Sequence, residues 1–358
     1  MSVKMSFRWF GEGNDTVSLR DIRQIPGIET IVWALHHKMP GEVWEKDEIC
    51  AVRDQIVPFG FNMDVVESVN VHDDIKTGSG SRDLYIDHYI QTIRNLAEFG
   101  VRVICYNFMP VFDWTRTELY HPLEDGSTAF FYEKSRILDD PKEMAAYILR
   151  NQNGMTLPGW EPERIAGLDE LFEKYRPVTK EKLWGNLQYF LEKLMPVCHE
   201  TGIRMAIHQD DPPWDIFGLP HLLTDEASVS RFLQMVDDPC NSLTLCAGTL
   251  SANPENDVAD MVRRHSDRIA FAHIRNVRHY ANGDFSEASV RDQCGETGIL
   301  RIMKALYDSE YDGYIRPDHG RQIWGEQSRP GYGLYDRALS AMYLLGVWDT
   351  LESERNTD

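Results

Sequence analysis

Four residues of metal-binding type each follow a short apolar segment in the second half of the chain. The segments span residues 203–207, 242–245, 269–272 and 313–317. The residues that come directly after them are His208, Cys246, His273 and Asp318. Neighbouring strands of a sheet lie about 4.8 Å apart, so side chains at four adjacent strand ends can converge on one ion if the sheet curves. The repetition therefore predicts a metal centre.

The predicted donor set is mixed, with two imidazole nitrogens, one thiolate sulfur and one carboxylate oxygen. Such a set suits Fe²⁺, Mn²⁺ or Zn²⁺ better than Mg²⁺ or Ca²⁺, and the thiolate favours zinc or iron over manganese. Taken alone, Cys246 would more often be a small buried hydrophobic residue, and one histidine at a strand end proves little. The occurrence of four ligands at equivalent positions is what favours a metal centre.

His319 stands directly beside Asp318. Adjacent residues of a strand point to opposite faces, so both side chains reach one site only if the chain turns at Asp318, which Pro317 and Gly320 favour. His319 then acts in catalysis or, alternatively, orients Asp318 from behind; we favour catalysis. A further candidate, Tyr332, lies between two glycines and is either catalytic or a surface aromatic residue.

Strand-like and helix-like segments alternate along most of the chain and position these residues. The strand-like segments span residues 7–10, 30–35, 61–66, 101–105, 203–207, 242–245, 269–272 and 313–317. The helix-like segments begin with Ser18 as an N-cap and continue at residues 46–57, 83–98, 180–199, 225–237, 256–265, 297–309 and 334–346. This alternation predicts an α/β fold, a (β/α)8 TIM barrel with its active site at the carboxyl ends of the strands.

Residues 111–178 interrupt the alternation after the fourth strand. This polar and aromatic stretch holds two short helical patterns, near residues 141–150 and 163–174. We predict that it forms an inserted cap of helices and loops over the site. Residues 1–350 would then be one catalytic domain, and residues 351–358 a polar C-terminal tail.

A doubly wound α/β sheet is the alternative architecture. It would place a glycine-rich phosphate-binding loop directly after the first strand. The glycine-rich stretch at residues 78–83 matches that pattern only in part and follows the third strand. The sequence also lacks Gly-x-Ser-x-Gly, His-Glu-x-x-His and phosphate-loop motifs, so the barrel is the prediction that we carry forward.

The charge balance limits the classes of partner. Among 358 residues, 57 are Asp or Glu and 37 are Lys or Arg, which gives a formal net charge of −20. Such a surface repels nucleic acid and anionic membranes. A small anionic substrate can still bind where a metal and a few cations reverse the local sign. No segment approaches the roughly 18 apolar residues of a membrane span.

The cysteines and the first residues indicate a compartment. Six cysteines are scattered along the chain without a Cys-x-x-Cys pair, and a chain of this size does not need disulfides to be stable. The first residues lack the apolar core of a signal peptide. We therefore expect reduced thiols and a cytoplasmic protein.

Seven short motifs, in order along the chain, resemble mannonate dehydratase of the hexuronate degradation pathway. They are Ala34-Leu-His-His37, Val65-Val-Glu-Ser-Val69, Cys105-Tyr-Asn-Phe-Met-Pro110, Asp113-Trp-Thr-Arg-Thr117, Asp210-Asp-Pro-Pro213, Arg316-Pro-Asp-His-Gly320 and Pro330-Gly-Tyr332. The resemblance runs from Arg8 to about Gly346, and the number and order of the motifs make it specific. The enolase-superfamily lineage with the same activity is not similar to this sequence.

The resemblance implies a metal-dependent barrel, related to xylose-isomerase-like proteins, that dehydrates D-mannonate to 2-keto-3-deoxy-D-gluconate with Mn²⁺ or Fe²⁺. The residues that match the family's metal ligands are His208, Cys246, His273 and Asp318. Its catalytic histidine and tyrosine fall on His319 and Tyr332. A homodimer is the expected assembly, and Zn²⁺ stays open as the metal because one ligand is a thiolate.

Dehydration of a sugar acid requires removal of a weakly acidic proton from C2 and loss of the C3 hydroxyl. Our hypothesis is that Tyr332 removes the proton and His319 protonates the departing hydroxyl. A free tyrosine has a pKa near 10, so Tyr332 needs nearby positive charge, for which the metal or Arg275 is available. The candidates for binding the substrate carboxylate and hydroxyls, at or just past strand ends, are Arg8, His72, Asn107 and Arg275.

Three other functions have to be weighed. A metal-dependent sugar isomerase or epimerase would use the same barrel and metal site but lose no water, so the mass of the product discriminates. A metal-dependent sugar-acid binding protein would bind its ligand without turnover. A phosphodiester-cleaving barrel enzyme is disfavoured, because it would need several metals and a basic groove.

Overall fold

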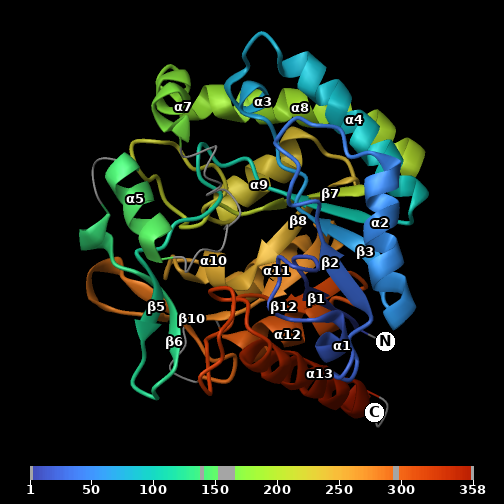
Figure 1. Ribbon diagram of the computed structural model, residues 1–358, viewed down its shortest axis with the longest axis vertical. Helices are drawn as coiled ribbons and strands as arrows, with labels where there is room; N and C mark the ends of the chain where they lie inside the picture. Colours follow the sequence, from blue (N-terminus) through green and yellow to red (C-terminus); the bar gives the residue numbers. More distant parts are fainter. Residues whose placement is uncertain (1–2, 138–140, 152–165, 293–297, 356–358) are drawn as a thin grey trace.

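The computed structural model describes residues 3–137, 141–151, 166–292 and 298–355. In this part of the chain, eight parallel strands close into a barrel that helices surround (Figure 1). The barrel strands are β1 Lys4–Arg8, β2 Thr30–Trp33, β3 Asn62–Glu67, β4 Val103–Tyr106, β7 Arg204–His208, β8 Asn241–Cys246, β9 Ile269–Ile274 and β12 Tyr314–Pro317. Their order around the barrel is β1-β12-β9-β8-β7-β4-β3-β2. The predicted (β/α)8 TIM barrel is confirmed.

Helices cover the outside of the barrel. The longer ones are α2 Lys46–Ile56, α4 Arg82–Glu98, α8 Lys180–Thr201, α9 Glu226–Met235, α11 Val258–His265, α12 Ile299–Asp308 and α13 Tyr335–Arg355. The short ones are α1 Leu19–Ile22, α3 Asp73–Thr77 and α10 Ala247–Ser251, with 3₁₀ turns at Val57–Phe59, Lys134–Arg136, Ser266–Arg268 and Ala281–Gly283. The long helices α4 and α8 lie side by side at the top of Figure 1, and α13 crosses the bottom.

Capping residues set the limits of several helices. Ser18 is the N-cap of α1, as predicted, because its hydroxyl accepts a hydrogen bond from the Asp21 backbone N–H at 3.2 Å. Thr179 caps the start of α8 in the same way. The other end of α8 stops at Gly202, whose φ of 72° is left-handed and favours glycine. The chain turns at Gly202 and then continues into β7.

The core of the barrel has two parts because each barrel strand buries both of its faces. A small cluster of residues from the strands themselves fills the barrel, and it consists of Val32, Val65, Val103, Cys105, Ala206, Ala270, Phe271 and Tyr314. The larger cluster lies between the strands and the helices and includes Ile31, Val66 and Ile104. Neighbouring residues such as Val65 and Val66 thus face opposite sides, as the two-residue period of a strand requires.

In its described residues, the insertion after β4 contains helices α5 Pro141–Asn151 and α7 Leu168–Tyr175, near the predicted positions. Residues 163–165 of the second helical pattern lie outside the described residues. The insertion also contains a β-hairpin that the sequence did not indicate, β5 Glu118–Pro122 and β6 Thr128–Tyr132.

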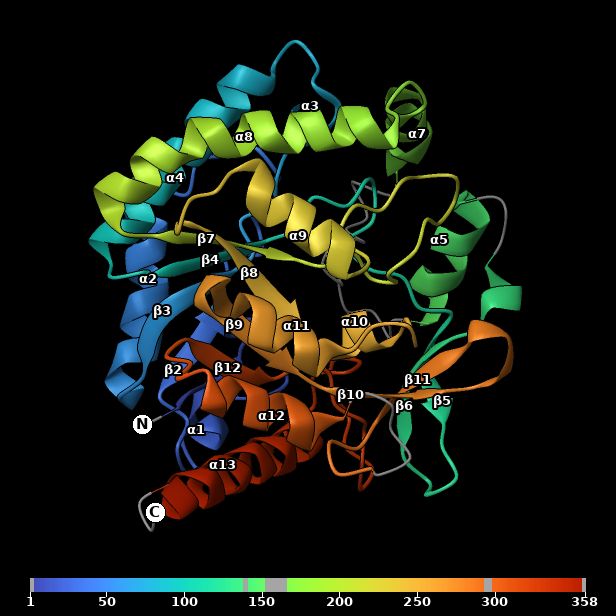
Figure 2. The same ribbon diagram turned by 180° about the vertical axis from the view of Figure 1, so that it is seen from behind.

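A second hairpin, β10 Asn276–His279 and β11 Phe285–Ala288, follows β9. The two hairpins join into a four-stranded sheet of order β10-β11-β6-β5, at the lower right of Figure 2. In it, Ser286 of β11 pairs with Phe131 of β6. Because this pairing joins segments far apart in the sequence, the local pattern carries no sign of it.

The last helix extends further than the sequence predicted. Residue 351 was expected to begin a polar tail, but α13 continues to Arg355. Contacts with α12 and the turn after it hold this end, since Tyr307 donates a hydrogen bond to Glu352 at 3.0 Å and Arg355 pairs with Glu310 at 2.8 Å. Residues 356–358 of the expected tail lie outside the described residues. No helix in the described ranges has both the length and the apolar composition needed to cross a membrane.

Candidate active site and metal centre

The four predicted metal ligands meet at the carboxyl ends of adjacent barrel strands. His208 ends β7, Cys246 ends β8, His273 lies in β9 and Asp318 directly follows β12. Possible ligand atoms of His208, Cys246 and His273 all lie within 4.8 Å of one another. Asp318 Oδ2 lies 3.5 Å from Cys246 Sγ and 3.9 Å from His273 Nδ1. The structure therefore brings together the set that the sequence predicted.

The surroundings of these side chains fit a divalent cation. His273 Nε2 and Glu67 Oε2 are buried, and neither has a hydrogen-bond partner among the described residues. The two atoms lie 3.5 Å apart. Leaving a buried polar atom unpaired costs about 1–3 kcal/mol, and a cation would remove that cost. His208 Nδ1 is held at 2.6 Å by the Gln209 carbonyl oxygen, an arrangement that fixes the ring of a metal-binding histidine and leaves Nε2 for the ion.

The protonation states of these groups prepare the site for a positive ion. Burial raises the pKa of the Cys246 thiol. Arg275 and His208 lower this pKa by a larger amount, so that it lies well below its usual value. Asp318 is likewise buried, and His319 and Arg316 hold its pKa well below the usual range. Burial disfavours the charged form of His208, but Cys246 raises its pKa to about 9. A bound cation would take over the role of that proton.

A buried network of charges lies beneath Asp318. Arg275 donates from Nε to Asp318 at 2.9 Å, from Nη1 to Glu287 at 2.7 Å and from Nη2 to Asp211 at 3.0 Å. Arg116 makes a two-pronged contact with Asp211, at 2.7 and 2.9 Å. These fixed charge-assisted bonds hold the Asp318 carboxylate in one orientation.

One glycine makes room for the network. A Cβ atom at Gly248 would lie only 2.5 Å from Arg275 Cγ and 2.8 Å from its Cζ. Gly248 lies in α10, two residues after the candidate ligand Cys246. The sequence around the thiolate therefore also determines where the guanidinium can lie.

His319 and Tyr332 form a pair beside the candidate metal ligands. His319 Nε2 and Tyr332 Oη are 3.0 Å apart, and His319 Nδ1 lies 3.4 Å from Glu287 Oε1. The ring of Phe130 packs edge-on against His319, with centroids 5.0 Å apart. The imidazole is thus held between a carboxylate and a phenol, with its orientation fixed by an aromatic wall.

Tyr332 has cations next to it, but Arg275, one of the two sources suggested by the sequence, is not among the main ones. Burial and Asp318 raise the pKa of the phenol, and Arg316 and Arg8 are the groups that oppose this rise. Arg275, which the sequence suggested for this role, lies in the charge network below Asp318 instead. A phenol in this setting keeps its proton until a partner removes it.

A pocket opens onto these groups, and its lining includes Arg8, Asn107, His208, Asp318, His319 and Tyr332. Arg8 Nη2 lies 3.3 Å from His36 Nε2, whereas its buried Nη1 has no hydrogen-bond partner among the described residues. Burial lowers the pKa of Arg8 to about 10, which leaves the guanidinium charged at neutral pH. Two of the four predicted substrate-binding residues, Arg8 and Asn107, therefore line the pocket.

The other two do not line it. His72 is the N-cap of α3, where its Nδ1 accepts a hydrogen bond from the Asp74 backbone N–H at 3.0 Å, and its ring stacks on Tyr85. It lines a neighbouring pocket that shares Arg8 with the first. Arg275 is 1% exposed and engaged with carboxylates. Its position fits the support of Asp318 better than contact with substrate.

Sequence reasoning gave no role to several carboxylates of the site, among them Glu67 and Glu287. Glu67 ends β3, faces the candidate ligand His273 and pairs with Arg316 at 3.0 Å. The signal that marks the four ligands, a polar residue at the end of an apolar strand, could have found it. Glu287 gave no such signal, because it lies in β11 of the second sheet, outside the barrel.

Comparison with known proteins gives a consistent result. The sequence model of the family described as D-mannonate dehydratase (UxuA) matches residues 3–358. The mannonate dehydratase of Shouchella clausii is 55% identical over 353 residues, which cover 98% of this chain and 98% of that protein. The crystal structure of mannonate dehydratase from Streptococcus suis has a TM-score of 0.87 at 40% identity and covers 98% of this chain and 95% of the other.

More distant structures share only the fold. A xylose isomerase domain protein from Planctomyces limnophilus has a TM-score of 0.52 at 11% identity, with 100% of this chain and 99% of the other covered. The predicted relation to xylose-isomerase-like barrels is confirmed at the level of the fold.

Proposed function

We propose, on the premise that the chain belongs to the D-mannonate dehydratase family, that it converts D-mannonate to 2-keto-3-deoxy-D-gluconate and water at a single metal centre. The observation that carries the proposal is the convergence of four metal-ligand candidates beside the His319–Tyr332 pair in one pocket. Dehydration requires both stabilisation of negative charge, which a cation at the four candidate ligands would supply, and proton transfer, which the His319–Tyr332 pair would supply.

The cation would be held by His208, Cys246, His273 and Asp318. When bound, it would act as a Lewis acid that stabilises negative charge on the substrate carboxylate and on the oxygen at C2. We propose Mn²⁺ or Fe²⁺ as the native ion. Zn²⁺ is the alternative that the thiolate ligand favours.

The His319–Tyr332 pair supplies both the base and the acid. His319 Nε2 takes the phenolic proton through the 3.0 Å hydrogen bond, which leaves a phenolate and an imidazolium. Burial and Asp318 raise the pKa of the Tyr332 phenol and oppose this transfer, whereas Arg316, Arg8 and a bound cation would favour the phenolate. The Glu287 carboxylate, 3.4 Å from His319 Nδ1, would stabilise the imidazolium. One internal proton transfer therefore puts both residues into the forms that their roles require.

The reaction then balances without an outside proton donor. Tyr332 Oη takes the proton from C2, and the electron pair of that bond forms the C2–C3 double bond. The C3–O bond breaks, and His319 gives its proton to the departing hydroxyl, which leaves as water. The enol product becomes the 2-keto acid by tautomerisation, and the pair has returned to phenol and neutral imidazole.

Arg8 is placed to bind the carboxylate end of the substrate. Its Nη1 is buried in the pocket wall without a partner, and a carboxylate oxygen is the acceptor that a guanidinium binds best. Asn107, also in the wall, can both donate to and accept from sugar hydroxyls. These two contacts would orient C2 toward Tyr332.

The test is an assay of metal-stripped protein with D-mannonate, in which Mn²⁺, Fe²⁺ or Zn²⁺ is added back singly and 2-keto acid is followed. We expect keto acid only with a metal, and its loss in Cys246→Ser and Asp318→Ala. Metal binding with a product of unchanged mass would instead support the isomerase or epimerase alternative. Tyr332→Phe separates the two catalytic roles: if it keeps exchange of the C2 proton while dehydration stops, the base and acid assignments must be exchanged.

We also propose that the chain forms a homodimer in the cytoplasm. Four large apolar side chains near the start of α13 are more than 40% exposed, namely Trp324, Tyr335, Leu339 and Met342. Single exposed apolar residues are common, but a group of them is typical of an interaction surface. A reducing compartment suits a site in which the Cys246 thiol must stay free to bind a metal.

A further inference from the structure

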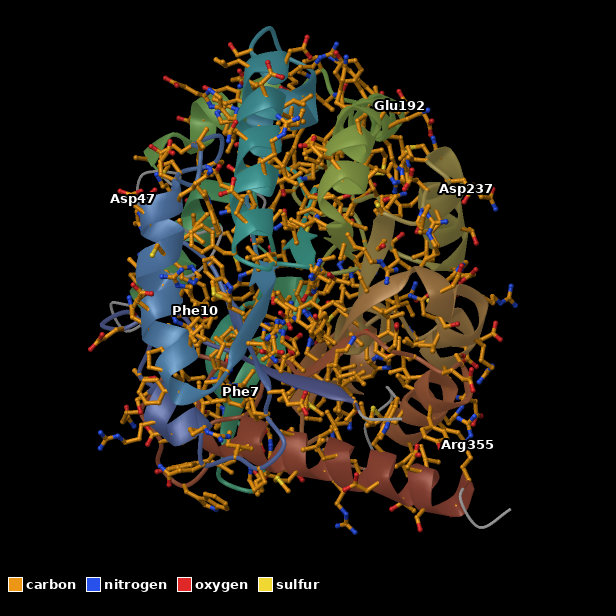
Figure 3. All side chains as sticks on the ribbon, turned by 90° about the vertical axis from the view of Figure 1, so that its right-hand side faces the viewer. Phe7, Phe10, Asp47, Glu192, Asp237 and Arg355 are labelled. Atoms are coloured by element: carbon orange, nitrogen blue, oxygen red, sulfur yellow. The ribbon has the colours of Figure 1, made fainter. Side chains whose placement is uncertain are left out.

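A histidine, an aspartate and a cysteine meet at the amino-terminal end of the barrel. His199 lies in the last turn of α8, and Asp238 and Cys240 lie in the loop between α9 and β8. Figure 3 shows Asp237, the neighbour of Asp238, at the outer edge of the molecule. Cys240 directly precedes the six-residue strand β8, and Cys246 of the active site ends it. Six residues of strand span about 20 Å, so this cluster is separate from the active site.

The cluster has the geometry of a histidine ligand with a carboxylate behind it. His199 Nε2 lies 2.7 Å from Asp238 Oδ2, and His199 Nδ1 lies 3.9 Å from Cys240 Sγ. Asp238 is itself held in place, because its Oδ1 accepts a hydrogen bond from the Cys240 backbone N–H at 2.8 Å. A carboxylate that holds one ring nitrogen fixes the tautomer and makes the other nitrogen a better ligand. The other nitrogen here faces a thiol.

The spacing fits a thiophilic ion. Tetrahedral zinc binds nitrogen at about 2.0–2.1 Å and sulfur at about 2.3 Å, which places two such ligand atoms about 3.6 Å apart. The observed 3.9 Å requires only a small rotation of one side chain. Atoms of all three residues lie within 4.8 Å of one another. The His199 side chain is 55% exposed, so water can complete the coordination shell.

We propose that His199 and Cys240, with Asp238 behind the imidazole, form a second cation site for thiophilic divalent ions such as Zn²⁺. Thiolate and imidazole ligands favour such ions over Mg²⁺ and Ca²⁺. The ion ties the end of α8 to the start of β8, two elements that the chain joins only through β7 and α9. Occupancy therefore stabilises the folded chain without entering the catalytic reaction.

The test is a titration of full-length Cys246→Ser protein with Co²⁺, read by the absorbance of thiolate-to-cobalt charge transfer. The substitution removes the catalytic thiolate, so the remaining signal reports on other cysteines. We expect an absorbance that saturates at one ion per chain and that disappears when Cys240→Ser is added. Cys50→Ser is the matched control, because Cys50 is another partly exposed free thiol, and it should leave the signal unchanged.

Absorbance that is absent from Cys246→Ser, or that persists after Cys240→Ser, overturns the proposal. Asp238→Asn keeps both ligand atoms and should weaken Co²⁺ binding by roughly 10- to 100-fold; an unchanged affinity would show that the carboxylate has no part in the site. Cys240→Ser alone should keep the wild-type rate of dehydration. None of the binding measurements needs turnover, so a failure of the proposed dehydration is distinguishable from a failure of this site.

Discussion

Replacement of Glu287 by glutamine tests the chemistry of the His319–Tyr332 pair most directly. The side chain of Glu287 is fully buried, and its Oε1 lies 3.4 Å from His319 Nδ1. Glutamine keeps nearly the same shape and one acceptor oxygen but removes the negative charge. In the proposed reaction, that charge stabilises the imidazolium which protonates the leaving hydroxyl.

The expected effect follows from the loss of one charged contact. A hydrogen bond to a charged group contributes about 1.5–3 kcal/mol, and each ~1.4 kcal/mol added to a barrier slows the reaction about tenfold. Glu287→Gln should therefore lower kcat by roughly 10- to 150-fold. Glu287 does not line the substrate pocket, so KM for D-mannonate should change little.

The assay is steady-state formation of 2-keto acid from D-mannonate, with bound metal and the thermal midpoint measured on the same sample. These two additional readouts are needed because Glu287 also pairs with Arg275 and Arg116. Glu118→Gln is the matched control: Glu118 lies in the same sheet and also contacts a histidine, His121, at 2.7 Å, but it does not line the pocket.

A kcat within about threefold of wild type, a change worth less than about 0.7 kcal/mol, would refute the reasoning if metal content and stability are also unchanged. A large loss of activity together with loss of metal would assign Glu287 to the support of Asp318 through Arg275. An equal loss in Glu118→Gln would mean that the sheet, rather than the charge, is responsible.

Three further predictions follow from single contacts. Gly248→Ala forces Arg275 out of place and should lower the stability by about 1–3 kcal/mol, measured by thermal unfolding. Gly346→Ala is the control, because it has open space around it and should not destabilise the protein. Equal unfolding midpoints for the two variants would show that the charge network can shift. Arg8→Lys keeps the positive charge but loses the planar guanidinium. It should raise KM about tenfold, which corresponds to a loss of about 1.4 kcal/mol of binding free energy, with a smaller effect on kcat. An unchanged KM would show that Arg8 does not contact the substrate. Trp324→Asp should convert the proposed dimer to monomers in light scattering, and a persistent dimer would place the interface elsewhere.

The sequence predicts the barrel and the convergence of the four candidate ligands well, because both depend on local patterns. Each strand is a short apolar run, and each ligand stands where such a run ends, so His208, Cys246 and His273 could be found without knowing what lies beside them. Asp318 and His319 required one more step, a turn after Pro317, and β12 does end at Pro317.

The local pattern fails where a side chain's role depends on a distant partner. His72 lies in a loop after a strand, where a substrate-binding histidine is expected, yet its side chain caps α3. The local sequence is the same for a capping histidine and for a substrate-binding one. Arg275 follows β9 as expected, but three carboxylates from other segments turn its guanidinium away from the pocket. Glu287 depends on pairing between β11 and β6, which only the folded chain brings together.

The second sheet has a consequence for how activity is gained during folding. Its strands come from two insertions, one after β4 and one after β9, and their pairing closes a long loop of chain. Contacts between distant segments form late, because the entropy of loop closure must first be overcome. A refolding chain should therefore recover the circular dichroism of the barrel before it recovers dehydratase activity, since β11, which carries the Glu287 carboxylate beside His319 Nδ1, is fixed in place only when the two insertions have met.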